Sequence, residues 1–357
     1  MKVRRRLPTS RSAVRRRPPR WTRPGDCRST AIGSPATADD EGRDSGVSHH
    51  QGADVTHGVA LRLRFRLEAA LFDVFAAAVS VTSPRGRLAP GSVFGTLFWL
   101  LAVRLRRLAS ANVRLAYGEA VAPREVRRIV LGSMRHFARI AVETLAFPKY
   151  PTDSLAAHVR VEGLEHLRGA LARGKGVIGF TGHLGHWELL AYTLARAGIP
   201  ATGISRPLDN PHLERRLLRL RTLSGNRIIS KRGAFPEAVR VLEEGGFLGI
   251  WIDQRPKRGG VTISFFGRQT RARSTVAVLA LRTGAAIVPI FSVLEPDGLW
   301  RVVVEPEVRV GPTGDPEADT RRMTAETTAV LERWVRRYPE QWLWTHARWT
   351  PPASAGS

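Results

Sequence analysis

The segment GVIGFTGHLGHWELLAY (176–192) contains two side chains that could move a proton. Its apolar start predicts a buried strand that ends at Phe180, and its second half predicts a helix that begins near Gly185. His183 would then lie at the carboxyl end of the strand, where open α/β sheets bind their ligands. Glu188 follows five residues later. An offset of five places two side chains on different faces of a regular helix, so the two can meet only if His183 lies in the loop.

A histidine beside a carboxylate is typical of a general base, because imidazole accepts a proton near neutral pH and the carboxylate stabilises the imidazolium. The N-terminus of the following helix could stabilise a developing oxyanion. Other interpretations remain open at this point. The histidine and the glutamate can be chance neighbours, and His183, His186 and Glu188 can form a metal site, although HxxH with one acid is a weak zinc signature. His186 can also be a residue that hydrogen-bonds locally at the helix N-terminus.

Composition narrows the function classes. The chain has 357 residues, a formal charge of +25 and a single cysteine, Cys27, so it has no internal disulfide. The basic charge extends beyond the N-terminal tail and favours anionic partners such as lipid head groups, nucleic acid or an acidic protein. Because zinc-finger, RRM and helix-turn-helix signatures are missing, nucleic acid is not expected as a partner.

The chain divides into three predicted regions. Residues 1–54 are rich in Arg, Pro and Ser without an apolar period, and we expect a disordered basic tail. Residues 55–150 are predicted as a helical region with apolar segments at 67–82 and 93–103. Both segments are shorter than a membrane-spanning helix of about 20 residues and are flanked by arginines. They can be interfacial anchors on an anionic membrane surface or ordinary core helices.

The third region, 151–350, alternates short β-rich runs with helices, which predicts an α/β fold with a mixed or largely parallel central sheet flanked by helices. The strands are expected at 174–180, 246–252, 285–294 and 299–305, where Val, Ile and Phe gather between Gly or Pro. The helices are expected at 187–198, 212–223, 235–245, 274–284 and 316–337.

Several ordered motifs resemble the late acyltransferases of lipid A biosynthesis, a family whose relatives acylate phosphatidylinositol mannosides. The resemblance runs from about 59 to 350 and rests on these segments: NVRLAYGE (112–119), TGHLGHWE (181–188), SRPLDNPHLERRLLRLR (205–221), WIDQRP (251–256), ISFFGRQTRARST (263–275), RTGAAIVPIF (282–291) and YPEQWLWTHARW (338–349). It implies a fold like that of the glycerolipid acyltransferases.

By position, the resemblance implies that His183 is the general base, that Glu188 is its partner, and that Arg221 and Asp253 also belong to the catalytic group. Asp253 follows a predicted strand, and its alternative role is to pair with one of the arginines. The same resemblance places four residues at the substrate: Arg206 of the R-P element and three residues of FFGR, namely Phe265, Phe266 and Arg268. The two phenylalanines would line the acyl-chain slot, although plain core packing is equally compatible with the sequence.

The implied reaction is direct acyl transfer without a covalent enzyme intermediate, a metal or a cofactor. Its donor would be acyl carrier protein or acyl-coenzyme A, and its acceptor a hydroxyl of a membrane glycolipid. The implied location is the cytoplasmic face of the bacterial inner membrane. Two alternatives remain: a glycerophospholipid acyltransferase, and a basic membrane-binding or nucleic-acid-binding protein without catalysis. The first normally has Asp where this chain has Glu188, and it has an EGTR-like element that this sequence lacks.

Overall fold

The computed structural model describes residues 51–80, 88–146, 155 and 157–349. From Asp54 onward these residues belong to one compact unit. The tail predicted at 1–54 lies, up to residue 50, outside the described residues, as does the end of the chain from residue 350.

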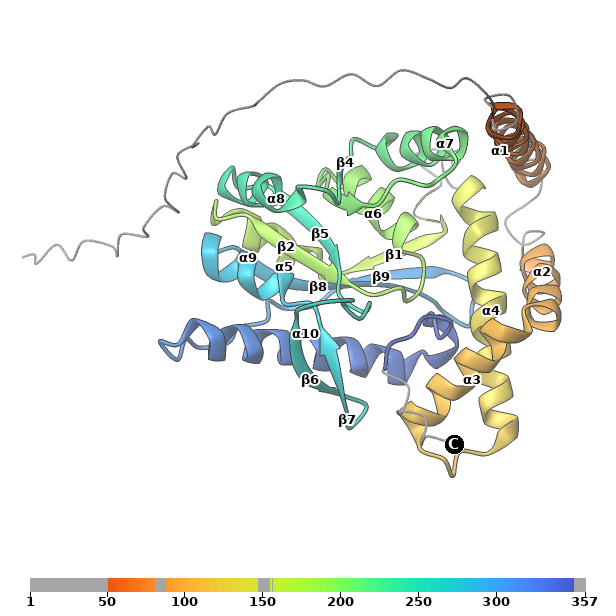
Figure 1. The fold of residues 1–357 in the computed structure, drawn as a ribbon. Helices are drawn as coiled ribbons and strands as arrows, with labels where there is room; N and C mark the ends of the chain where they lie inside the picture. Colours follow the sequence, from red (N-terminus) through yellow and green to blue (C-terminus); the bar gives the residue numbers. More distant parts are fainter. Residues whose placement is uncertain (1–50, 81–87, 147–154, 156, 350–357) are drawn as a thin grey trace, which may run out of the picture. The chain divides into compact units, whose positions relative to one another are not determined.

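A central sheet organises the described chain (Figure 1). Its seven strands, within the described residues, follow the order β1-β9-β8-β2-β5-β3-β4. Their bounds are β1 Val159–Glu162, β2 Val177–Thr181, β3 Thr202–Ser205, β4 Arg227–Ser230, β5 Phe247–Trp251, β8 Ala286–Leu294 and β9 Trp300–Val304. Neighbouring strands are parallel except for β8 and β9, which are antiparallel. The predicted α/β class with a mostly parallel central sheet is therefore confirmed.

The four predicted strands correspond to β2, β5, β8 and β9. The sequence did not predict β1, β3 and β4, because a run of four residues such as TGIS is too short to display a strand pattern. It also missed the antiparallel hairpin of β6 (Val261–Phe265) and β7 (Arg268–Ala272), which lies outside the central sheet.

Helices cover both faces of the sheet (Figure 1). On one face, α5 (Leu164–Leu171) and α6 (Trp187–Arg196) pack with the core residues Val177 and Phe247. On the other face, the residues Ile178 and Leu248 pack with three helices: α8 Ala234–Glu243, α9 Thr275–Thr283 and α10 Pro316–Arg337. The remaining helix of this region, α7 (Pro211–Thr222), has no fully buried side chain.

Four helices precede the sheet in the described chain: α1 Gln51–Ser80, α2 Leu88–Leu101, α3 Val103–Tyr117 and α4 Pro123–Ala146. Buried residues of α3 and α4, among them Val113 and Ile129, join the main core. By contrast, large apolar side chains of α1 and α2 are exposed: Val59, Leu61, Leu63, Leu67, Leu71, Val74, Val93, Phe94, Leu97, Phe98, Leu100 and Leu101. Among the described residues, no helix is both long enough and apolar enough to cross a membrane.

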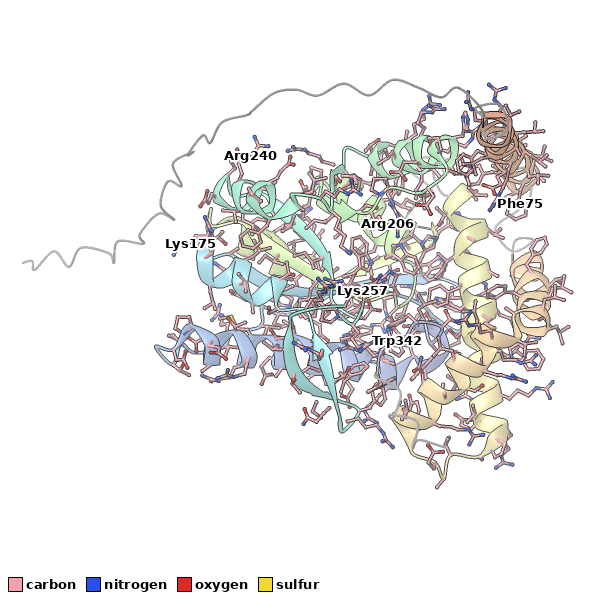
Figure 2. All side chains as sticks on the ribbon, in the orientation of Figure 1. Phe75, Lys175, Arg206, Arg240, Lys257 and Trp342 are labelled. Carbon is pink, nitrogen blue, oxygen red and sulfur yellow. The ribbon has the colours of Figure 1, made fainter. Side chains whose placement is uncertain are left out.

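The aromatic segment after α10 folds back into the molecule through the 3₁₀ turn η3 (Pro339–Gln341). Trp342 and Trp344 are fully buried and Trp349 is nearly so, and Trp342 lies among the interior side chains in Figure 2. The rings of Trp342 and Trp344 meet edge to face at a centroid distance of 4.6 Å. These tryptophans therefore serve packing, which was one of the two roles compatible with the sequence, and not anchoring at a membrane interface.

Candidate active site

The register of two neighbouring strands brings His183 and Asp253 together. β2 and β5 are parallel neighbours, and their last paired residues are Thr181 and Trp251. The ladder continues for one more bond, because the backbone N–H of Ile252 donates to the carbonyl of Thr181 at 3.0 Å. His183 and Asp253 each follow this last pair by two residues. Their equal offset places them side by side at the carboxyl edge of the sheet.

The carboxylate of Asp253 holds His183 through two hydrogen bonds. Asp253 Oδ1 lies 2.8 Å from His183 Nδ1, and Oδ2 accepts the backbone N–H of His183 at 2.7 Å. An ionised carboxylate only accepts hydrogen bonds, so the proton of the neutral imidazole lies on Nδ1 and leaves Nε2 as the basic nitrogen. This tautomer is the one that a general base for a substrate hydroxyl requires.

The environment shifts the proton affinities of both partners. Burial by itself lowers the pKa of His183, but the charge of Asp253, the hydrogen bond to Asp253 and the charge of Glu188 outweigh burial and raise that pKa above its usual value. Burial by itself raises the pKa of Asp253, yet the charge and hydrogen bonds of His183 hold it below its usual range. Because the pKa of Asp253 is lowered and the pKa of His183 is raised, this buried carboxylate stays ionised while the imidazole titrates.

Two glycines of the TGHLGHWE segment permit this close packing. A Cβ atom at Gly182 would lie 2.8 Å from Leu331 Cδ1 and 3.3 Å from Asp253 Oδ2. Gly185 has a φ of +62°, and a Cβ atom there would collide with the carbonyl of Ser292. The loop can therefore approach Asp253 and β8 only because these two positions lack side chains.

Glu188 has a different partner from the one that the sequence predicted. Its carboxylate lies in the first turn of α6 and binds Arg221 of α7, whose Nε and Nη2 donate at 3.0 Å and 2.6 Å to Oε1. Arg221 also donates from Nη1 to the hydroxyl of Ser205 at 3.0 Å. The carboxylate that hydrogen-bonds His183 is that of Asp253. The two arginines considered as its partners pair with other carboxylates, Arg206 with Asp209 and Arg221 with Glu188.

His186 has the local role that the sequence left open. It is the N-cap residue of α6, and its Nδ1 accepts the backbone N–H of Leu189 at 3.2 Å. Burial lowers the pKa of His186 to about 3, so the ring is neutral at physiological pH. Across the described chain, no three His, Cys, Asp or Glu side chains are arranged as a metal site.

A largely apolar cavity of about 510 Å³ opens beside His183. Glu188, Arg206 and Arg221 also line it, together with Lys231 and Arg273. The apolar part of its wall comes from both faces of the sheet: Phe180, Leu190, Leu194, Ile204, Phe235, Ala238, Phe247, Ile250 and Leu279. The cavity therefore combines cationic side chains and a histidine with a wall of the kind that binds a hydrocarbon chain.

The structure separates the predicted substrate-binding residues into two groups. Arg206 lines the cavity but is 74% exposed and forms an ion pair with Asp209 at 2.8 Å. Phe265, Phe266 and Arg268 are not among the cavity-lining residues. The two phenylalanines lie in the main core, where Phe265 stacks on Trp349 and Phe266 packs against Trp344, and the exposed Arg268 donates to the carbonyl of Leu115 at 2.6 Å. The geometry thus favours core packing over an acyl slot at these rings.

The sequence did not predict two residues, Trp342 and His346, that contact Asp253. Trp342 Nε1 donates to Asp253 Oδ2 at 3.0 Å, and His346 Nε2 lies 3.2 Å from the carbonyl of Asp253. Both come from the C-terminal aromatic segment, 89 and 93 residues along the chain from Asp253. That segment was recognised as a motif, but no spacing rule connects it with a strand so distant in the sequence.

Known proteins resemble this chain over most of its length. The model of the bacterial lipid A biosynthesis acyltransferase family matches residues 70–350. A phosphatidylinositol mannoside acyltransferase of Mycolicibacterium smegmatis is 28% identical over 62% of this chain and 72% of its own length. The lipid A biosynthesis lauroyltransferase of Escherichia coli is 26% identical over 72% of this chain and 83% of its own length. The lipid A biosynthesis palmitoleoyltransferase of Escherichia coli is 26% identical over 71% of this chain and 82% of its own length. The family match includes β2, β5 and both residues of the His183–Asp253 pair, and the chain belongs to the bacterial lipid A biosynthesis acyltransferases, enzymes that transfer acyl groups.

Proposed function

We propose that this acyltransferase moves a fatty acyl chain from an acyl thioester to a hydroxyl of a membrane glycolipid. The donor is acyl carrier protein or acyl-coenzyme A, and the acceptor is of the lipid A or the phosphatidylinositol mannoside type. The names of the relatives support such an acceptor. The observation that carries the proposal is the Asp253-bound imidazole of His183 beside an apolar cavity.

In the proposed reaction, His183 Nε2 accepts the proton of the acceptor hydroxyl while its oxygen attacks the thioester carbonyl. The C–O bond forms, a tetrahedral oxyanion develops, and the C–S bond then breaks. The leaving thiolate takes the proton from the imidazolium, so His183 returns to its starting state. The buried charge of Asp253 stabilises the transient imidazolium and keeps the ring oriented.

The Glu188–Arg221 pair is proposed to position the donor. Arg221 of α7 is held by hydrogen bonds to both carboxylate oxygens of Glu188, and it lines the cavity. A guanidinium fixed in this way can stabilise the oxyanion or bind a phosphate of the donor or acceptor. Lys231 and Arg273 add positive charge to the same cavity, which suits the anionic substrates.

Membrane association is proposed to use the exposed apolar side chains of α1 and α2. Trp99 of α2 lines a groove of about 580 Å³ together with arginines of α3 and α4. Arg106 and Arg127 both lie over the Trp99 ring, at 4.6 Å and 5.0 Å from its centroid. Apolar side chains beside arginines favour binding at an anionic lipid surface, as on the cytoplasmic face of the inner membrane.

The test is a transfer assay with membranes from a strain that lacks its own late acyltransferases. Purified protein receives labelled acyl-acyl carrier protein or labelled acyl-coenzyme A separately. We expect label in a glycolipid with wild type, and its loss by at least about 100-fold with His183→Ala, because general-base catalysis contributes at least that factor. His166→Ala, on the exposed side of α5, is the matched control and should transfer normally. Label that appears only in phosphatidic acid would move the acceptor to the glycerophospholipid class, and normal turnover by His183→Ala would refute the mechanism.

A further inference from the structure

Three glycines line up across adjacent strands in the cavity wall. Gly179 of β2 pairs in register with Gly249 of β5, and Gly249 pairs with Gly203 of β3. All three line the cavity beside His183. Glycine weakens a strand, and it is expected there mainly where the backbone bends or where another group approaches closely. A glycine in this row can therefore be required either by a neighbouring part of the protein or by a group that binds in the cavity.

At Gly249, neither the backbone nor the packing of the protein requires glycine. Its φ lies outside the left-handed region, and a Cβ atom would have as its nearest neighbour the carbonyl oxygen of Thr202, at 3.9 Å. The added atom would therefore occupy open space in the cavity. The other two positions are tighter, because a Cβ atom would lie 3.1 Å from Ile228 Cδ1 at Gly203 and 2.5 Å from the Phe247 ring at Gly179.

The row lies between the reacting end and the deeper end of the cavity. Along β2 and β5, the next residues on the same face are Thr181 and Trp251, which lie two residues before His183 and Asp253. In the opposite direction the cavity is lined by Phe247, at the start of β5, and by Leu194 of α6. From Gly179 to the end of β2 at Thr181 the chain advances two residues, or about 7 Å at the rise of a β-strand, and His183 follows in the loop. A chain bound with its carbonyl at His183 would have to cross the glycine row to reach Phe247 and Leu194.

We propose that this glycine row is the floor of the acyl-chain site and that the missing side chain at Gly249 determines the longest acyl chain that the enzyme accepts. The inference rests on the proposed function, because it takes the cavity as the place where the transferred chain binds. Side chains of increasing size at residue 249 would then close the deeper part of the cavity step by step, while His183 and Asp253 keep their geometry.

The test measures chain-length preference in wild type, Gly249→Ala and Gly249→Leu with decanoyl, lauroyl, myristoyl, palmitoyl and stearoyl donors. We expect the longest accepted chain to shorten from wild type to Ala to Leu. For the longest wild-type substrate, kcat/KM should fall by about tenfold or more in Gly249→Leu, because each methylene that loses its burial costs about fourfold. Decanoyl transfer should change little. Gly203→Ala is a second variant in the same row and should shift the preference in the same direction.

The matched control is Gly169→Leu, an equally large addition at an exposed glycine of α5 with no atom near its Cβ position. Its chain-length profile should equal that of wild type. Thermal unfolding shows which variants are folded, and if Gly249→Leu does not fold, Gly249→Ala and Gly203→Ala decide the outcome. An unchanged profile in folded variants of an active enzyme overturns the inference and leaves the proposed function intact.

A second measurement separates the two proposals without turnover. Saturated fatty acids of increasing length compete with a fluorescent fatty acid for the purified protein. Chain-length-dependent displacement that Gly249→Leu shifts to shorter acids supports the glycine row even if wild type transfers nothing, a result that would overturn only the proposed function. Displacement that is identical in wild type and Gly249→Leu overturns the inference.

Discussion

Replacement of Asp253 by asparagine should separate the orientation of His183 from the rest of the site. Asp253 accepts three N–H groups: the backbone and Nδ1 of His183, and Nε1 of Trp342. An amide of the same shape has one accepting oxygen, and its nitrogen can only donate. In Asp253→Asn, the imidazole must either lose its partner or turn to the tautomer with the proton on Nε2, which cannot act as the base.

The size of the effect follows from these contacts. Loss of the general base lowers kcat by about 10²–10⁴-fold. The fold should survive, because one unsatisfied buried donor costs about 1–3 kcal/mol of the free energy of unfolding. The charge of Asp253 raises the pKa of His183, so that pKa must fall in the variant. The free base would then persist to lower pH than in wild type.

Two assays check this prediction together: steady-state transfer rates and NMR titration of the His183 imidazole. Glu188→Gln is the comparison variant, because Glu188 also raises the pKa of His183 but contributes less than Asp253. We expect a downward pKa shift in both variants, larger in Asp253→Asn. A folded Asp253→Asn protein with a rate within a few-fold of wild type and an unchanged His183 pKa would refute the orienting role.

Two further predictions concern stability and membrane binding. Burial lowers the pKa of His136 and of His186 to about 3, below an unfolded value of about 6.5, so their contribution to stability is complete above pH 6.5 and is lost as the pH falls toward 3. At pH 5, the loss of this contribution lowers the free energy of unfolding by about 2 kcal/mol for each histidine. His186→Asn, which keeps an N-cap side chain, should remove about half of this loss in urea unfolding at pH 7 and pH 5. An equal loss in wild type and variant would contradict the assignment. Phe98→Asp with Leu101→Asp, at exposed positions of α2, should abolish vesicle binding that resists high salt, measured by co-sedimentation; retained binding would exclude α2 as the apolar anchor.

The sequence predicted the parts of the site that depend on local pattern. His183 follows a buried strand, and Asp253 follows another, so their place at the carboxyl edge of a sheet could be expected from apolar runs alone. Which strands are neighbours could not, because β2 and β5 are separated by β3 and β4 in the chain. Glu188 was therefore predicted to pair with His183 of the same segment, whereas the strand register places Asp253 beside His183.

The hairpin β6–β7 illustrates the other limit of sequence reasoning. Phe265 and Phe266 lie close to Arg268 in a segment that resembles a motif of acyltransferases, which is why the sequence predicts a substrate role for them. Whether an aromatic ring lines a cavity or fills a core depends on its neighbours in space. Here those neighbours are tryptophans of the C-terminal segment, about 80 residues further along the chain at Trp344 and Trp349.

The hydrogen bond from Trp342 to Asp253 also bears on how the enzyme is made. A growing polypeptide folds from its N-terminus as synthesis proceeds, so β2 and β5 can pair long before the aromatic segment exists. Until that segment docks, the buried carboxylate lacks one of its three donors, and the core lacks Trp342 and Trp344. The hydrogen-bond set around Asp253 is therefore completed only after the aromatic segment has been synthesised and has docked.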